Sequence, residues 1–175
     1  MKKSVLRQNE NNNSRVDGGD GMPNKVIYLD EVWEKRAETI RQKALLGFPW
    51  NDLERFYEQV MDPILDYCQS DRRCLIDEAA YRLAYQVFQL GMEASRKLAY
   101  EPDPQDYKPC MHAYEGDTEQ SVQTWMEQYG LDEADEEEQE LDQQSIVYEL
   151  FTQLATSWFC RGLTYGLRLR KQKLL

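Results

Sequence analysis

The sequence predicts an all-α protein, a compact bundle of about five helices behind a disordered N-terminal tail. Three observations lead to this expectation. Apolar residues recur three and four positions apart along several long segments, which is the period of an α-helix. Glycine, proline and helix-capping residues separate these segments, and 175 residues, 41% of them apolar, are enough to bury one core. We therefore expect a single helical domain over residues 25–175.

Residues 1–24 make up the predicted tail. They include Asn11-Asn12-Asn13 and Gly18-Gly19-Asp20-Gly21, and they contain almost no aromatic residues. Such a segment buries too little apolar surface to offset the entropy lost on ordering. We expect this tail to be disordered.

A first helix is expected from about Asp30 to Gly47. Asp30 is a residue type that caps helix N-termini, and Gly47 with Pro49 just beyond it is typical of a helix end. Four apolar residues at helical spacing form a stripe along one face of this helix: Trp33, Ala37, Ile40 and Ala44. We expect that face to pack on the core.

A second helix is expected to open at Asn51, because Glu54 three residues later completes a capping box. Its apolar stripe runs without a change of phase from Leu53 to Cys68. Pro63 lies within that stretch and cannot donate a backbone hydrogen bond. The helix is therefore either kinked there or restarted with Pro63 in its first turn.

A long third helix is expected from about Arg72 to Ala99. Its apolar face is broad, and the small residues Ala80, Ala84 and Gly91 along it would let another helix approach closely. The segment Glu101-Pro102-Asp103-Pro104 ends it, because proline removes backbone donors and forces the preceding residue out of the helical region.

The rest of the chain is expected to hold a loop and two more helices. Residues 101–117 form the loop, a short helix capped by Asp117 ends at Gly130, and the last helix runs from about Gln143 to Lys171. The second, third and last helices provide the core. All four tryptophans are expected to pack in this core: Trp33, Trp50, Trp125 and Trp158. Trp50 and Trp125 lie near helix ends, where a side chain can stay partly exposed.

A weak internal repeat relates the third helix to the last one. At an offset of 71 positions, six of the 24 positions from 75 to 98 carry identical residues, among them Phe88 with Phe159 and Gly91 with Gly162. One explanation is a pair of related helical hairpins facing each other across a pseudo-twofold axis, with the two glycines at points of close contact. The other is chance similarity between two amphipathic helices rich in Leu and Ala.

The charge of the chain is distributed unevenly. The net charge is −11 at pH 7, and residues 101–142 carry −14 whereas residues 143–175 carry +4. This acidity disfavours direct binding of nucleic acid and of anionic membranes, both of which require cations. Eight carboxylates occupy the 11 positions of an acidic run: Asp132, Glu133, Asp135, Glu136, Glu137, Glu138, Glu140 and Asp142.

Two interpretations of the acidic run are open. One is a solvated linker whose like charges repel each other. The other is a binding surface for a basic partner, such as the nucleic-acid groove of an enzyme, in which carboxylates take the place of phosphates. The last helix and the residues after it also carry a group of five basic residues: Arg161, Arg168, Arg170, Lys171 and Lys173. These cations complement the negative end of the helix dipole, fold back on the acidic run, or contact an anionic partner.

No pattern in the sequence identifies a catalytic or metal site. A catalytic pair of Cys110 and His112 is disfavoured, because the surrounding carboxylates should raise the pKa of the thiol. Zinc ligation by these two residues with Cys68 and Cys74 lacks the paired short spacings of structural zinc sites. There is no Gly-rich phosphate loop and no serine nucleophile elbow. We expect no catalytic residue, no cofactor and no metal.

The expected function is non-enzymatic. With no apolar leader, no membrane span and no compact cysteine spacing, the sequence predicts a cytoplasmic protein with reduced thiols. We expect it to act by protein–protein contact through its acidic region. In its most specific form the hypothesis is an inhibitor that occupies the basic groove of a nucleic-acid-processing enzyme as a nucleic-acid mimic, an anti-CRISPR-like role of the kind mobile elements carry against host defence. This last step rests on analogy.

Two alternatives belong to other classes of protein. One is a Mg²⁺-dependent all-helical nucleotide hydrolase, which needs carboxylates converging on a shared metal. The other is a structural homodimer that uses the broad face of the third helix. The carboxylate pairs available to the hydrolase are Glu31 with Glu34, Asp62 with Asp66, and Asp77 with Glu78.

Overall fold

The computed structural model describes residues 28–66, 68–99, 108–132 and 138–175, and for residues 138–143 it describes the backbone alone. The regular structure in these residues is helical, which confirms the predicted all-α class. The predicted tail at residues 1–24 lies outside the described residues. The elements in chain order are α1 (Leu29–Gly47), α2 (Trp50–Phe56), a π-helical turn (Tyr57–Met61), α3 (Asp62–Leu65), α4 (Ser70–Leu98), α5 (Lys108–Ala113), α6 (Glu115–Gln128) and α7 (Glu138–Lys171).

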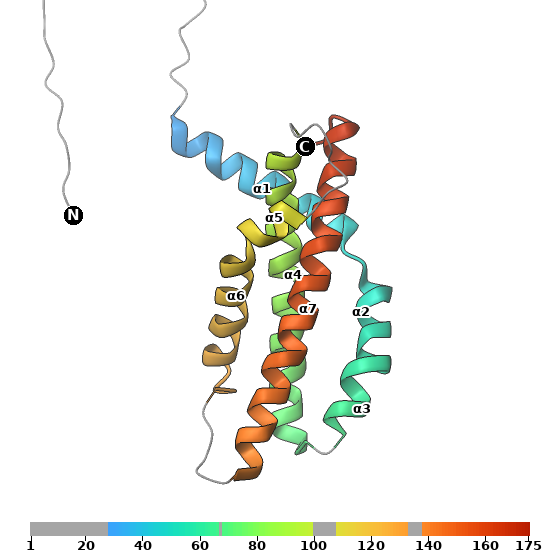
Figure 1. The fold of residues 1–175 in the computed structure, drawn as a ribbon. Helices are drawn as coiled ribbons and strands as arrows, with labels where there is room; N and C mark the ends of the chain where they lie inside the picture. The colour runs from blue at the N-terminus through green and yellow to red at the C-terminus, as the bar shows by residue number, and fades with distance from the viewer. Residues whose placement is uncertain (1–27, 67, 100–107, 133–137) are drawn as a thin grey trace, which may run out of the picture.

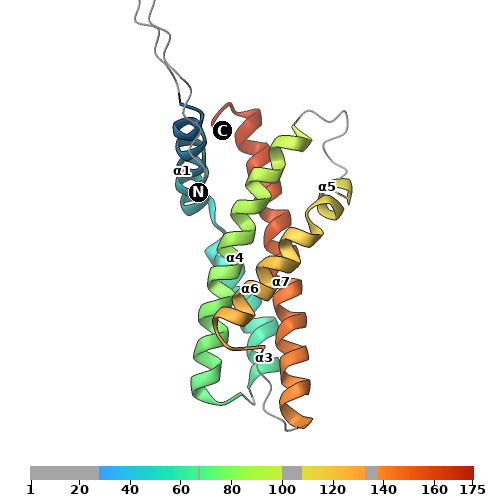
Figure 2. The same ribbon diagram turned by 90° about the vertical axis from the view of Figure 1, so that its left-hand side faces the viewer.

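The two long helices α4 and α7 form the centre of the bundle and run side by side in the same direction (Figure 1). The rod made by α2, the π-helical turn and α3 lies along one side of this pair. On another side, α6 lies across the seam between α4 and α7 and contacts both helices (Figure 2). Helix α1 lies across one end of the bundle, and its first turns project beyond the body (Figure 1).

The central helices meet at two glycines. A Cβ on Gly91 would lie 2.2 Å from the carbonyl oxygen of Phe159, and a Cβ on Gly162 would lie 2.0 Å from the carbonyl oxygen of Phe88. Because any side chain at these positions would collide with backbone, only glycine permits this approach. The predicted close-contact points at Gly91 and Gly162 are thereby confirmed.

The same contact bears on the internal repeat. Phe88 and Gly91 pack on Phe159 and Gly162, which are the residues that the 71-position offset aligns. In each half of the chain, a helical rod runs along the bundle and a long helix returns, so that α4 and α7 lie at the centre (Figure 1). This arrangement is the one expected for two hairpins related by a pseudo-twofold axis, and it favours a true repeat over chance similarity.

The second predicted helix is continuous and contains a widened turn. Helical structure extends from Trp50 to Leu65, and the π-helical turn directly precedes Pro63. At the end of this turn the amide of Asp62 donates to the carbonyl of Tyr57, five residues back. Pro63 has no N–H to donate, and its ring would collide with the carbonyl four residues earlier in a regular helix. The wider turn relieves that collision.

The segment between α4 and α7 differs from its prediction. Residues 108–113, expected in a loop, form α5, with Pro109 in the first turn, where a missing N–H costs nothing. Helix α6 begins at Glu115, so Asp117 lies within its first turn and is not its cap. The helix ends at Gln128, two residues before Gly130, whose φ of 61° suits glycine at a helix end.

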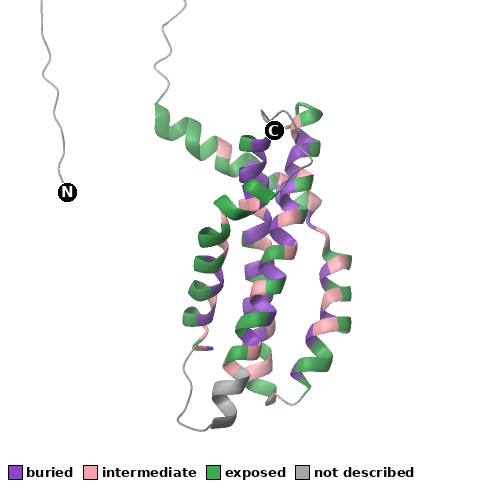
Figure 3. Ribbon diagram, in the orientation of Figure 1, coloured by how far each residue is buried: buried purple, intermediate pink, exposed green. Residues whose placement is uncertain are grey.

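The buried side chains follow the two central helices (Figure 3). Of the four tryptophans, Trp158 is 0% exposed and fills the centre of the core, and Trp125 is partly buried. The expectation was wrong for Trp33, which is 56% exposed, and Trp50 is also 51% exposed. The reason for Trp33 is that α1 contacts the bundle only with its second half, through Ile40 and Ala44.

The apolar face that a homodimer of α4 would require is already covered. Ala80, Ala84 and Gly91 are buried within one chain. In the part of the chain that the structure describes, no helix combines the length and the apolarity needed to cross a membrane.

Candidate functional site

The acidic region, residues 101–142, includes α6, which lies upstream of the acidic run. Four carboxylates on this helix are exposed to solvent: Glu115, Asp117, Glu119 and Glu127. The sequence from Pro109 to Asp142 contains no lysine and no arginine. We call these four residues together with Asp132 the acidic flank. Within it, α6 faces outward on the side of the bundle opposite α2 (Figure 1).

The structure places the eight predicted binding residues in three groups. Asp132 follows α6, is partly exposed, and its carbonyl accepts a hydrogen bond of 2.7 Å from Nε2 of Gln144. Four others, Glu133, Asp135, Glu136 and Glu137, lie outside the described residues. The last three belong to the first turns of α7, where only the backbone is described: Glu138, Glu140 and Asp142.

The start of α7 corrects the prediction that the last helix begins near Gln143. The helix begins five residues earlier, at Glu138. Glutamate is a good helix former, and carboxylates in a first turn are stabilised by the positive end of the helix dipole. The final part of the acidic run is therefore helical and is not part of a linker.

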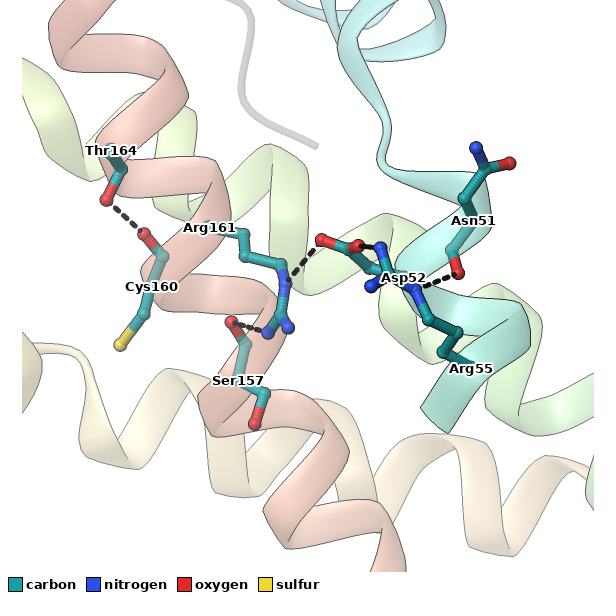
Figure 4. Close-up of polar contacts among 7 residues, drawn as sticks. All are labelled: Asn51, Asp52, Arg55, Ser157, Cys160, Arg161 and Thr164. Carbon is teal, nitrogen blue, oxygen red and sulfur yellow. Dashed lines mark hydrogen bonds and ion pairs between the residues drawn. The ribbon is translucent and has the colours of Figure 1, made fainter. Parts of the chain in front are cut away.

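A second feature is a groove of about 620 Å³ between α7 and the junction of α1 and α2. Arg161 crosses it, with its Nε atom 3.4 Å from Oδ2 of Asp52 (Figure 4). The other carboxylate oxygen of Asp52 accepts from Arg55 at 2.5 Å. Arg161 also donates to the carbonyl of Ser157 at 3.2 Å and lies over the ring of Trp158 at 4.6 Å. Of these contacts, the pair of Asp52 with Arg161 connects α2 to α7.

The groove does not present an activated nucleophile. Burial raises the pKa of the Cys160 thiol, and the nearby Arg161 only partly opposes this. A raised pKa leaves the sulfur in its unreactive thiol form at neutral pH. The hydroxyl of Thr164 donates to the carbonyl of Cys160 at 2.9 Å and so is engaged within its own helix.

A third feature is a cleft of about 550 Å³ between the first half of α1 and the last turns of α4, which we call the cationic cleft. Arg170 forms part of its wall and donates from Nε to Oγ of Ser95 at 2.8 Å. The Nζ atom of Lys97 lies 4.5 Å from the centre of the Tyr114 ring. The residues that line the cleft are Trp33, Arg36, Ala37, Ile40, Glu93, Arg96, Lys97, Tyr114 and Arg170.

The cysteines and the histidine do not come together. All four cysteines are free thiols. Cys110 lies on α5 and is buried, and its burial raises the pKa of the thiol. His112 is exposed and pairs through Nδ1 with Glu115 at 3.0 Å. Cys68 and Cys74 lie by the turn from α3 to α4, whereas α5 is near the other end of the bundle (Figure 1).

The carboxylate pairs considered for magnesium do not form a metal site among the described residues. Glu31 and Glu34 are exposed on α1. Asp62 and Asp77 share the guanidinium of Arg73, whose Nε lies 3.0 Å from Asp77. Among the described residues, no group of three His, Cys, Asp or Glu side chains is arranged to hold a metal ion.

The fold and these surfaces define the class: an all-α bundle with a central pair of parallel helices, an acidic flank and a cationic cleft. Comparison with known proteins found no match, whether to a protein-family model, to a curated protein or to a solved structure.

Two of these features were not predicted from the sequence: the pairing of Asp52 with Arg161, and the cationic cleft. Asp52 and Arg161 are 109 residues apart in the chain, and nothing local to either indicates the pairing. The cationic cleft joins α1, α4 and α7. The spacing of Glu93, Arg96 and Lys97 places them on one face of α4. This pattern is present in the sequence, but it indicates a cleft only once α1 is known to lie opposite that face.

Proposed function

We propose that the protein acts by binding another protein, and that its acidic flank contacts a basic surface of that partner. The observation that carries the proposal is the exposure of four carboxylates on α6, a helix without a single lysine or arginine. Because unbalanced charge of one sign steers and orients a partner of the opposite sign, such a surface favours association with a basic protein.

The length of this surface adds to the argument. Glu115 and Glu127 are 12 residues apart on one helix, a span of about 18 Å along its axis. The acidic run then continues the same sign of charge to Asp142. Duplex DNA carries one negative charge per about 1.7 Å of its axis. A basic groove that binds several phosphates therefore has a length comparable to that of this acidic surface.

In its finer form, the proposal is that the partner is a nucleic-acid-processing enzyme of the cytoplasm and that this protein inhibits it by occupying its nucleic-acid groove. The carboxylates take the place of phosphates, and the protein itself does not bind nucleic acid. This form is supported by charge and by analogy.

The experiment is capture of partner proteins on the immobilised full chain from a cytoplasmic extract at low salt. One variant neutralises the flank on α6: Glu115→Gln, Asp117→Asn, Glu119→Gln and Glu127→Gln. A matched control neutralises four exposed glutamates elsewhere: Glu31→Gln, Glu34→Gln, Glu54→Gln and Glu58→Gln. The flank variant should capture much less of a specific protein, and the control should capture as much as the unchanged chain.

The finer form has its own readout. Captured protein is released in parallel with duplex DNA and with sodium chloride at the same ionic strength. Release by DNA at concentrations where the salt has no effect supports a shared nucleic-acid groove. Equal losses from the flank variant and from its matched control would mean that only total charge matters, and the proposal would be wrong.

A further inference from the structure

Helix α1 carries an apolar stripe that continues beyond the bundle. Ile40 and Ala44 are buried at its inner end. Trp33 and Leu29 lie on the same face about two and three turns before Ile40 and are exposed by 56% and 71%. Leu29 and Ile40 are 11 positions apart, or about 16 Å along the helix axis. The half of this face nearest the N-terminus has no covering element among the described residues.

The opposite wall of the cationic cleft is made by α4 and is positively charged. Arg96 and Lys97 are exposed in the last turns of α4, and Arg36 faces them from α1. Glu93 is the one carboxylate among the described lining residues, and burial raises its pKa with Arg36 opposing the shift. Among the described lining residues, cations therefore outnumber carboxylates, although the chain as a whole carries −11.

The side of the cleft formed by α7 is held in place by buried groups. Arg170 donates to Oγ of Ser95, which is 0% exposed and itself donates to the carbonyl of Met92 at 2.6 Å. The arginine is thus anchored to α4 by a fully buried hydroxyl. This anchoring fixes the α7 side of the cleft relative to α4.

We propose that the cationic cleft is a docking site for an acidic amphipathic helix of another protein. The apolar stripe of such a helix packs on Leu29, Trp33 and Ala37, and its flanking carboxylates pair with Arg36, Arg96 and Lys97. This is the helix-in-groove mode of recognition, in which apolar anchors recur at three and four positions. The site is separate from the acidic flank, and the inference does not rest on the function proposed above.

Two observations select this occupant. The exposed part of the apolar stripe, from Leu29 to Ala37, is about two turns long, which matches a helix better than a small molecule confined to the cleft. The three cations on the rim select carboxylates, because arginine and lysine pair with them and would repel a basic segment. A second copy of α1 matches this rim less well, because residues 29–47 carry four acidic and four basic side chains and therefore no net negative charge.

The test uses a synthetic peptide of about 14 residues, with leucines at helical spacing and glutamates on both flanks, and a second peptide with lysine in place of each glutamate. Binding of fluorescein-labelled peptide to the full chain is measured by anisotropy. The acidic peptide should bind and the basic peptide should not. Raising the salt should weaken binding, since the rim charges are exposed.

Variants of the cleft locate the site. Arg96→Glu combined with Lys97→Glu should weaken binding of the acidic peptide by about tenfold or more at low salt. Trp33→Ala should weaken it by about tenfold, because a tryptophan anchor is removed. The matched controls lie on the opposite face of α1: Lys35→Glu and Leu46→Ala, which should leave the affinity within about twofold.

Three outcomes would overturn the proposal. One is equal binding of the acidic and basic peptides. Another is a loss of affinity in the two controls as large as that in the cleft variants. The third concerns a different occupant: if sedimentation velocity shows a dimer of the intact chain that Trp33→Ala dissociates, a second copy covers the stripe.

Circular dichroism of each variant checks that helix content is unchanged, which is expected because the substituted side chains are exposed.

Discussion

The carbonyl oxygen of Phe159 lies 2.2 Å from the position that a Cβ on Gly91 would occupy. The reciprocal contact, Gly162 with Phe88, is equally close. Two parallel helices from different halves of the chain therefore meet backbone to backbone. The rest of the bundle is arranged around this contact.

Substituting either glycine should destabilise the protein. In Gly91→Ala and Gly162→Ala the added methyl group meets backbone atoms, which cannot move aside as the end of a side chain can. Overpacking of this kind costs about 1–3 kcal/mol, and the gain of about 1 kcal/mol in helix propensity opposes it only in part. Because the added methyl groups meet backbone atoms, we expect the upper end of that range, about 3 kcal/mol, so that the free energy of unfolding in urea falls by about 2 kcal/mol in each variant.

Gly116 provides the matched control. It lies in α6, and nothing stands within 4 Å of the position that its Cβ would take. Gly116→Ala should therefore raise the free energy of unfolding by about 0.5–1 kcal/mol through propensity alone. If all three substitutions changed stability by the same amount and sign, close packing at the central seam would not be the cause.

The central contact was predictable because it depends on local pattern. The periodic apolar faces of the two long helices and the shared Phe-x-x-Gly define which residues face each other once two hairpins pair symmetrically. The long helices were also located to within a few residues, except at the start of α7. There the charge of Glu138 to Asp142 suggested a linker, although glutamates at a helix N-terminus are favourable.

The remaining differences come from tertiary arrangement. The stripe of α1 has a regular helical period, but period alone does not say how much of a helix the bundle covers, and so Trp33 was expected in the core. The pairing of Asp52 with Arg161 and the cationic cleft require elements distant in sequence to meet. The local sequence pattern carries no information about which distant elements meet.

A buried tyrosine should make stability depend on alkaline pH. The hydroxyl of Tyr57 donates to the carbonyl of Asp77 at 2.9 Å, and burial is the main cause that raises its pKa above the ordinary value. In the unfolded chain the phenol ionises near pH 10, whereas the folded state retains the proton. The stabilisation is therefore complete below about pH 10 and is lost as the pH rises above it.

The variant Tyr57→Phe tests this relationship. At pH 7 it should lower the free energy of unfolding by about 1 kcal/mol, through loss of the hydrogen bond. Between about pH 9.5 and 11, its stability should fall less steeply than that of the unchanged chain. The exposed Tyr148→Phe serves as control and should alter neither quantity. Parallel pH profiles for the unchanged chain and Tyr57→Phe would contradict the assignment.

The four thiols should differ in reactivity. Cys74 is exposed, whereas burial raises the pKa of Cys68, Cys110 and Cys160. Since the thiolate is the reacting species, these three thiols, of which Cys110 is buried and the other two are partly buried, should react slowly in the folded protein. With Ellman's reagent at pH 8, one fast thiol is expected, and Cys74→Ser should remove that fast phase while Cys110→Ser leaves it. A fast phase that survives in Cys74→Ser would show that another thiol is accessible.

Arg73 connects α3 to α4 by bridging two carboxylates. Its guanidinium contacts Asp62 through Nη2 and Asp77 through Nε, and its side chain is only 21% exposed. Arg73→Met keeps the apolar stem but leaves two carboxylates facing each other without a cation. We expect a loss of about 1–2 kcal/mol in the free energy of unfolding, more than an ordinary surface pair contributes.

Repulsion between the two carboxylates can be separated from the lost pairing. Adding Asp62→Asn to Arg73→Met should recover part of the loss, because one of the two like charges is gone, whereas Asp62→Asn alone should destabilise by removing a partner of Arg73. Salt should narrow the difference between the single and double variants, since Asp62 is more than half exposed. If Asp62→Asn had the same effect in both backgrounds, Arg73 would not couple the two carboxylates, and the turn between α3 and α4 would be held by the packing of Leu65 and Ile76 alone.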